Sequence, residues 1–524
     1  MHKSALRLLG FLLLVSACSP GTATPAAYPT YDPFVSSDPA ALPVQVAESA
    51  PQPTRTAGPT PTRASLSVTL PPKRDPSLPI STPTPDTPRA LPTPRQSADQ
   101  YVVQAGDTLG SIAQQYGVSV QVLMESNGLA DGNILSIGQT LTIPAPEPGA
   151  VGPSFKIIPD SELVYGPASA LFNVDEFINS KKGFLAGYTQ DVDGELLTAS
   201  QIVTLVAQNY SVNPRLLLAL LEHRSGWVSR TDVAATDYPL GFVDDFHIGL
   251  YRQLTWAANE LNRGFYLWRV NAVSTWVLAD GTVVPVNPTI NAGTAGVENL
   301  FAQLDGLEAW KADVDAFGLF QTYYLLFLQS PFDLAIEPLR PASLAQPRMI
   351  LPFERGDTWS FTGGPHGGWD TGSAWAAVDF APPAEERGCV QSDVWVTAVA
   401  DGFITRAANG AVIQDLDNDG YEQTGWVVLY MHVETRDRVA RGTYVTAGER
   451  IGHPSCEGGV SNGTHVHLAR RYNGEWISAD GTIPFNLDGW ISSGNGTEYD
   501  GYFTRGSRKI EAWDDVNELN QISR

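Results

Sequence analysis

The chain has 524 residues with 33 basic and 56 acidic side chains, which gives a formal net charge of −23 and an isoelectric point near 4.7. Hydrophobic residues make up 43% of the chain and aromatic residues 10%, so most of it can bury cores, and wholesale disorder is excluded. The acidic excess would repel phosphate backbones and no basic run offsets it, so we expect no nucleic-acid partner. The length allows roughly two to four domains.

Residues 1–18 are typical of an export signal. Lys3 and Arg7 supply positive charge, residues 8–15 are apolar, and small residues precede Cys18. This ending resembles the bacterial lipoprotein lipobox, which implies cleavage before Cys18 and lipidation of its thiol; the alternative is an ordinary secretory signal with an incidental cysteine. We expect an extracytoplasmic protein, lipid-anchored to the bacterial cell envelope. No second apolar stretch is long enough to span a bilayer, so attachment to the membrane would depend on the lipid.

Residues 19–98 are rich in proline and threonine. Such a segment buries too little apolar surface to offset the cost of ordering the chain, and its prolines favour extended polyproline II. We predict a disordered stalk that separates the remaining domains from the membrane.

Residues 99–145 have the pattern of a small α/β module. Strand-like segments begin and end it, and Leu109, Ile112 and Tyr116 have helical spacing, followed by a second helical pattern. Asp107 or Thr108 can cap the first helix. The segment resembles the LysM module along nearly its whole length. The resemblance implies a βααβ fold and binding of N-acetylglucosamine-containing glycans such as peptidoglycan.

Residues 154–345 are predicted to be mainly helical. Asn213 and Pro214 form a helix start, and Glu222 lies near the end of that helix. The segment around Glu222 resembles the lysozyme-like helix of lytic transglycosylases, which implies that Glu222 is the acid that protonates a glycosidic oxygen. The alternative is a structural or glycan-binding helical domain, because Arg224 lies close by and the family's Gly-Leu-Met-Gln stretch has no clear match. Apolar spacing predicts helices over 199–210, 215–222, 254–261, 296–307 and 317–329.

Residues 350–495 contain most of the histidines. His465 and His467 flank an apolar valine in a strand-like run, and a period of two places both imidazoles on one face. Asp379 lies among apolar residues, as a buried metal ligand would, and His366 lies in a glycine-rich stretch. Two histidines and one aspartate leave the fourth zinc position to water, which is the arrangement of a catalytic site.

These segments resemble the zinc endopeptidases of the lysostaphin and LytM type, which have a mainly antiparallel β fold. His366 and Asp379 are thirteen residues apart, and this long spacing resembles the beta-lytic and staphylolysin-like branch. The resemblance implies one Zn²⁺ per chain bound by His366, Asp379 and His467. It also implies that His432 and His465 flank the attacking water as catalytic residues.

Other motifs carry weaker predictions. If Cys18 carries lipid, Cys389 and Cys456 remain as an even pair, and we expect a disulfide between them; two unpaired buried thiols are the alternative. His453 matches no role in the family, and we expect a solvated turn histidine.

The acidic stretch 415–420 has the aspartate spacing that begins an EF-hand loop. Asp415, Asp417 and Asp419 occupy the oxygen-ligand positions, but Trp426 stands where that loop has glutamate. We expect a hairpin turn, and a calcium site at Asp415 to Asp419 stays open.

The sequence as a whole predicts a multidomain cell-wall hydrolase. The LysM module would dock on peptidoglycan glycan, the zinc domain would cleave its peptide cross-links, and residues 496–524 would form a C-terminal extension. The alternatives are a non-catalytic envelope scaffold or activator, and glycan cleavage by the helical region through Glu222.

Overall fold

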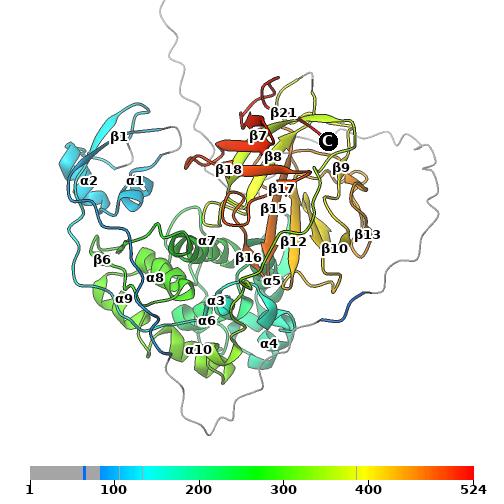
Figure 1. Cartoon of the computed structure of the whole chain (residues 1–524). Helices are drawn as coiled ribbons and strands as arrows, with labels where there is room; N and C mark the ends of the chain where they lie inside the picture. Colours follow the sequence, from blue (N-terminus) through cyan, green and yellow to red (C-terminus); the bar gives the residue numbers. More distant parts are fainter. Residues whose placement is uncertain (1–62, 67–82, 105–106, 133, 385) are drawn as a thin grey trace, which may run out of the picture. The chain divides into compact units, whose positions relative to one another are not determined.

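The computed structural model describes residues 63–66, 83–104, 107–132, 134–384 and 386–524 (Figure 1). The expected export signal, Cys18 and most of the expected stalk lie outside the described residues. Within the described ranges, no helix combines the length and apolar character needed to cross a membrane.

The LysM module has the βααβ order expected from its sequence. Thr108 caps the first helix, and its side chain accepts a hydrogen bond from the backbone N–H of Ser111. Apolar residues from both helices and from the closing strand form a small separate core that includes Leu109, Leu123 and Leu141. The elements are β1 (Asp99–Val102), α1 (Leu109–Tyr116), α2 (Val120–Asn127) and β2 (Thr140–Ile143), and β1 pairs with β2 antiparallel.

The helical region follows the predicted apolar spacing. Asn213 is the N-cap of α6 and Pro214 is its first residue, as predicted. The long helices α7 and α8 pack closely, and Gly264 and Gly296 lie where they meet: a Cβ on Gly264 would come within 2.5 Å of the carbonyl oxygen of Ala295. The helices are α3 (Asp160–Leu163), α4 (Val174–Lys181), α5 (Ala199–Tyr210), α6 (Pro214–Ser225), α7 (Leu250–Arg269), α8 (Ala292–Leu304), α9 (Leu307–Asp313) and α10 (Leu319–Phe327). Hairpins join β3 (Thr189–Val192) to β4 (Glu195–Thr198) and β5 (Thr275–Val277) to β6 (Val283–Pro285).

Residues 350–524 form a β domain around a large antiparallel sheet with the strand order β13-β10-β11-β12-β15-β8-β7-β21, and β16 pairs with β15 (Figure 1). The sheet strands are β7 (Thr358–His366), β8 (Ala377–Ala381), β10 (Gly402–Ala408), β11 (Ala411–Asp415), β12 (Trp426–Met431), β13 (Tyr444–Val445), β15 (Val466–Tyr472), β16 (Glu475–Trp476) and β21 (Gln521–Ser523). A two-stranded sheet pairs β9 (Val396–Thr397) with β14 (Arg450–Gly452). A four-stranded sheet contains β17 (Asn486–Leu487), β18 (Trp490–Gly494), β19 (Gly501–Arg505) and β20 (Arg508–Glu511).

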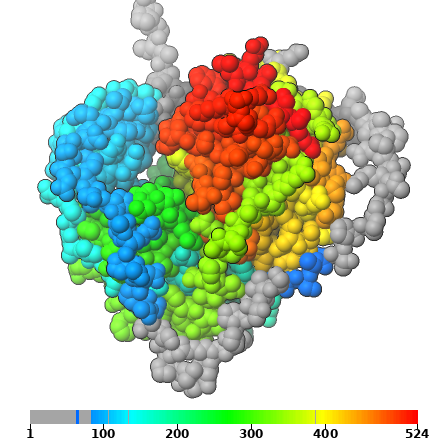
Figure 2. Space-filling model, viewed as in Figure 1, coloured from blue at the N-terminus to red at the C-terminus, as the bar shows by residue number. Residues whose placement is uncertain are grey.

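The C-terminal residues belong to the β domain, which corrects the expectation of a separate extension over 496–524. Strand β19 pairs with β18, and β21 pairs with β7 at the edge of the large sheet. The C-terminal residues, drawn in red, pack on the surface of the β domain (Figure 2). These pairings satisfy backbone groups that an unpaired edge strand would expose, and the β21–β7 pairing connects residues more than a hundred positions apart in the chain.

Both faces of the large sheet are buried. Along β12, Val428 and Tyr430 pack in the core of the β domain, whereas Val427, Leu429 and Met431 belong to one hydrophobic cluster with the helical region. Successive side chains of a strand point to opposite faces, so this alternation assigns one face of the sheet to each core. The helical region therefore covers one face of the sheet that carries the candidate site.

Candidate metal centre

The metal-ligand candidates lie on neighbouring strands of the large sheet. His366 ends β7, Asp379 lies in the middle of β8, and His467 is the direct cross-strand partner of Asp379 on β15. His366 Nε2 lies 2.9 Å from His467 Nδ1, and each of these nitrogens lies 3.3 Å from Asp379 Oδ1. The strand pairing thus brings together three residues that are spread over about a hundred positions of the sequence.

The hydrogen bonds of the two histidines show which ring nitrogens face each other. His366 Nδ1 lies 2.8 Å from the carbonyl oxygen of Gly364, and His467 Nε2 lies 3.2 Å from that of Gly368. A carbonyl oxygen only accepts, so in the neutral rings these two nitrogens carry the protons, and His366 Nε2 and His467 Nδ1 then present lone pairs. Asp379 Oδ1 is buried and has no hydrogen-bond partner among the described residues.

Three acceptor atoms therefore converge on one point, and a cation is the group that satisfies them together. Zinc binds histidine nitrogen and carboxylate oxygen at about 2.0–2.2 Å in tetrahedral geometry, which places neighbouring donors about 3.3 Å apart. The separations of 2.9 and 3.3 Å match this spacing. The donor set fits zinc, and the carbonyl groups that orient both imidazoles are the usual outer partners of zinc-binding histidines.

His432 and His465 flank this centre. The ring centroids of His432 and His465 are 4.5 Å apart, and His465 Nε2 lies 3.8 Å from Asp379 Oδ2. His432 Nδ1 donates to the carbonyl oxygen of Glu457, and His465 Nδ1 donates to that of Gly463, so each ring keeps Nε2 as a proton acceptor. Burial and the neighbouring imidazoles hold the pKa of His432 well below its usual range, which favours its neutral form.

The residues around Asp379 favour its ionised form, and the glycine opposite it on β7 leaves room for its carboxylate. Burial alone would raise the pKa of Asp379, but His366 and His465 hold it well below its usual range. Gly363 lies opposite Asp379 on β7, and a Cβ there would come within 2.5 Å of Asp379 Oδ2. Only glycine therefore leaves room for the carboxylate at this position.

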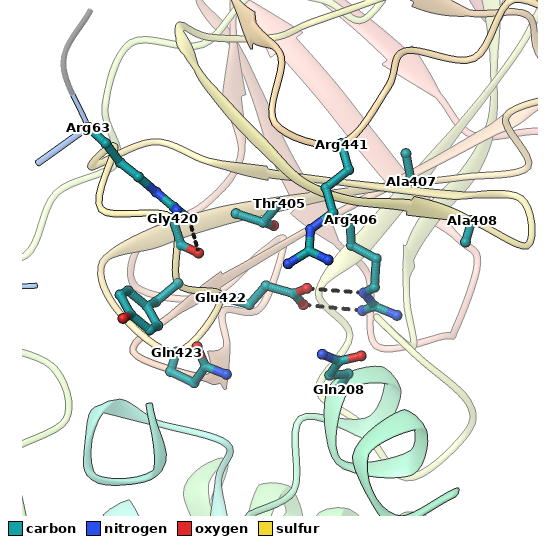
Figure 3. Close-up of a pocket in the computed structure, with 11 residues that line it drawn as sticks. Arg63, Gln208, Thr405, Arg406, Ala407, Ala408, Gly420, Glu422, Gln423 and Arg441 are labelled. Carbon is teal, nitrogen blue, oxygen red and sulfur yellow. Dashed lines mark hydrogen bonds and ion pairs between the residues drawn. The ribbon is translucent and has the colours of Figure 1, made fainter. Parts of the chain in front are cut away.

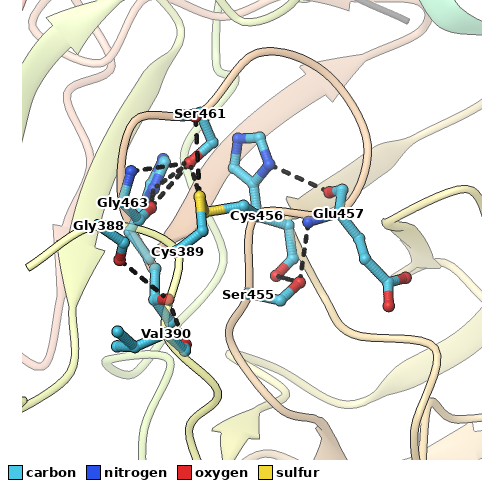
Figure 4. The surroundings of a disulfide bond; sticks show 11 residues. Gly388, Cys389, Val390, Ser455, Cys456, Glu457, Ser461 and Gly463 are labelled. Carbon is cyan, nitrogen blue, oxygen red and sulfur yellow. Dashed lines mark hydrogen bonds between the residues drawn. A yellow bond between two sulfur atoms is a disulfide. The ribbon is translucent and has the colours of Figure 1, made fainter. Parts of the chain in front are cut away.

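Cys389 and Cys456 form a disulfide, which Figure 4 shows between Gly388 and Val390 on one side and Ser455 and Glu457 on the other. Both neighbours of Cys456 contact His432: the backbone N–H of Ser455 donates to the His432 carbonyl oxygen over 2.7 Å, and the carbonyl oxygen of Glu457 accepts from its ring. His432 has a left-handed backbone with φ 64°, which costs free energy in a non-glycine residue and persists where neighbours hold it. The disulfide thus fixes the turn that holds His432.

Sequence reasoning missed Tyr499. Its ring stacks on the imidazole of His366 with centroids 4.2 Å apart, and the backbone N–H of Gly364 donates to its carbonyl oxygen. Tyr499 lies between β18 and β19, in the stretch predicted to form a C-terminal extension. No local spacing signals this contact, because the pairing of those strands brings the residue back to the site.

The carboxylate of Glu222 is engaged in hydrogen bonds with the turn that follows its own helix. Its oxygens accept hydrogen bonds from the backbone N–H groups of Val228 and Ser229 and from the Ser229 hydroxyl. The carboxylate thereby ties the end of α6 to the turn that follows it. These contacts favour a structural role.

The acidic turn forms a hairpin connection between β11 and β12, as expected. Oxygens of Asp415, Asp417 and Asp419 lie within 4.8 Å of one another. Burial and Asp415 raise the pKa of Asp417 to about 8. Asp415 accepts from the backbone N–H groups of Asp417 and Gly420, and Asp419 accepts from the Thr424 hydroxyl. Calcium binding at this turn stays an open prediction.

Two other features lie away from the metal centre. His453 is 3% exposed, and its Nδ1 donates to the carbonyl oxygen of Val394. The expectation of a solvated turn histidine is therefore wrong. The residue directly follows β14, and its ring packs against Trp395. A pocket of about 530 Å³ is lined by Gln208, Arg406, Glu422 and Arg441 among others (Figure 3). None of its lining residues is a metal-ligand candidate.

Comparison with known proteins agrees with the division of the chain into a LysM module and a helical region. The LysM domain family matches residues 101–144, and the family described as LasA, N-terminal domain, matches residues 156–339. Protease LasA of Pseudomonas aeruginosa is 26% identical over 293 residues, which cover 52% of this chain and 66% of the relative, just under two thirds of its length. The amidase XlyA of Bacillus subtilis, an N-acetylmuramoyl-L-alanine amidase, is 45% identical over 60 residues, or 12% of this chain and 20% of the relative.

A solved structure of the M23 metalloprotease pseudoalterin is 26% identical, covering 33% of this chain and 97% of that chain with a TM-score of 0.27. The LysM family match and the large antiparallel sheet make the chain a multidomain protein with a LysM module and a mainly β C-terminal domain. The lysozyme-like fold expected for the helical region stays a prediction, and the family matched there is a different one.

Proposed function

We propose that the protein is a zinc-dependent endopeptidase that cleaves peptide cross-links of peptidoglycan and is held on the polymer by its LysM module. The observation that carries the proposal is the convergence of His366 Nε2, His467 Nδ1 and Asp379 Oδ1, which leaves lone pairs on three adjoining acceptors. A zinc ion bound there would lower the pKa of a water molecule and polarise a substrate carbonyl.

The flanking histidines supply the proton transfers that peptide hydrolysis needs. His432 and His465 each hold Nδ1–H on a backbone carbonyl, which fixes the ring and directs Nε2 as an acceptor. One ring would take a proton from the attacking water at Nε2 and, as an imidazolium, pass that proton to the leaving amine, while Nε2 of the other ring would accept a hydrogen bond from the water. His366 is held in place by the stacked ring of Tyr499 and by the hydrogen bond from its Nδ1 to the carbonyl oxygen of Gly364.

The domain order supports an envelope location. Binding of glycan by the LysM module would raise the local concentration of peptide stems at the β domain. The protein would act outside the cytoplasm, attached to the membrane through lipid on Cys18 and separated from it by the stalk.

The test uses the full-length chain with purified peptidoglycan, with added zinc or with a chelator, while newly released amino groups are counted. The His465→Ala variant should keep its zinc, because His465 is not one of the converging ligands, and should release no amine. His247→Ala, a partly exposed histidine of the helical region, is the matched control and should behave as the unmodified chain does.

Each rival predicts a different outcome. Zinc binding without amine release would favour a non-catalytic scaffold. New reducing sugar ends that disappear in Glu222→Gln would favour glycan cleavage by the helical region.

A further inference from the structure

The loop that joins two of the metal ligands rests on the helical region. Residues 367–376 connect His366 to the strand that carries Asp379. Asn259 on α7 accepts a hydrogen bond from the backbone N–H of Gly372 over 2.7 Å, and its amide donates to the Thr371 hydroxyl over 3.3 Å.

Further contacts from the helical region hold the same loop. Arg263, one turn further along α7, donates to the Thr371 hydroxyl over 3.0 Å, and the Tyr210 hydroxyl at the end of α5 donates to Asp370 over 3.0 Å. The fit is close, because a Cβ on Gly372 would come within 2.0 Å of the Asn259 carbonyl oxygen. The loop therefore takes its shape from side chains outside the β domain.

The loop in turn orients a metal ligand. The carbonyl oxygen of Gly368 accepts the hydrogen bond from His467 Nε2, which leaves His467 Nδ1 to face His366 and Asp379. A Cβ on Gly368 would come within 2.7 Å of the Trp476 ring, and the indole N–H of Trp476 donates to the carbonyl oxygen of Tyr210. The position of Gly368 is thus fixed by the loop on one side and by the interface with the helical region on the other.

We propose that Asn259 and Tyr210 of the helical region are positioning residues of the metal centre, acting through loop 367–376 and the Gly368 carbonyl on His467. The inference rests on the proposed zinc site. A long loop between two ligands costs conformational freedom when the metal binds, and a loop already held in its bound shape reduces this cost. The helical region is accordingly part of the zinc-binding unit, in addition to covering the sheet.

The test measures zinc affinity, not activity. The full-length chain, stripped of metal, is titrated with zinc in competition with a chromophoric chelator. Loss of a group that orients a zinc ligand typically weakens binding about 10–100-fold. Since Asn259 and Tyr210 act through the loop, we expect the Asn259→Ala, Tyr210→Phe double variant to bind zinc about tenfold more weakly.

Matched variants separate positioning from general damage. Asn259→Asp keeps the oxygen that accepts from Gly372, so its zinc affinity should stay within about twofold of the unmodified chain. Thr255→Ala, one turn earlier on α7, removes a hydroxyl that bonds only to its own helix among the described contacts, and it should bind zinc normally. If the double variant fails to fold, Tyr210→Phe alone keeps the ring and should weaken binding about threefold.

The outcomes are distinguishable. Equal zinc affinity in the unmodified chain and in the loop-contact variants would overturn the positioning role and leave the proposed peptidase intact. Absence of zinc binding in the unmodified chain would overturn both.

Discussion

Replacing Glu422 by glutamine should destabilise the protein strongly. Glu422 is 6% exposed and accepts hydrogen bonds of 3.1 and 3.2 Å from Arg406 and of 3.0 Å from Arg471. Removing one partner of a buried ion pair typically costs about 3–5 kcal/mol, because the remaining charge is left uncompensated. Glutamine keeps one acceptor oxygen, so we expect a loss of about 3 kcal/mol in the free energy of unfolding at pH 7.

The effect has a defined pH dependence. Burial would raise the pKa of Glu422, but Arg406 and Arg471 hold it below its usual value. A carboxylate with a depressed pKa in the folded state stabilises the fold above its unfolded pKa of about 4.3, and this contribution is lost as pH falls through the folded pKa. The difference in unfolding free energy between the unmodified chain and Glu422→Gln should therefore have its largest value at pH 7 and become smaller below about pH 4.

Denaturant unfolding followed by tryptophan fluorescence at several pH values measures both effects. Glu195→Gln, an exposed residue of β4, is the control and should change the unfolding free energy by less than about 0.5 kcal/mol. A loss below about 1 kcal/mol for Glu422→Gln at pH 7, or a difference that stays constant into acid, would refute the reasoning.

Three further changes test other parts of the structure. Asp379→Asn should weaken zinc binding by more than about a hundredfold in a chelator competition, beyond the usual cost of losing an outer partner; unchanged affinity would show that Asp379 is not a ligand. Joint Cys389→Ser and Cys456→Ser substitution opens a loop of 67 residues and should lower the unfolding free energy by about 4 kcal/mol in denaturant titrations, with a result near zero contradicting a structural disulfide. Glu222→Gln should cost about 1–2 kcal/mol of stability and leave amine release from peptidoglycan unchanged; loss of release at normal stability would contradict its structural role.

The sequence determines the features that depend on near neighbours in the chain. The LysM module could be predicted because its helices, cap and closing strands lie within one short segment, where apolar spacing and the Thr108 cap suffice. The start of α6 at Asn213 and Pro214 follows from the same local rules. A period of two likewise predicts that His465, the residue before β15, and His467 on β15 lie on one side of the strand.

Only the tertiary structure decides the features that depend on distant pairing. The run from Trp426 to Met431 shows no polar alternation, and its burial on both faces became evident only with the helical region packed on one of them. Tyr499 reaches His366, and Gly368 orients His467, through strand pairings and loop contacts that no local pattern records. The physical reason is that side-chain period and capping are properties of a short stretch of backbone, whereas hydrogen bonds across a sheet join residues whose separation in sequence carries no signal.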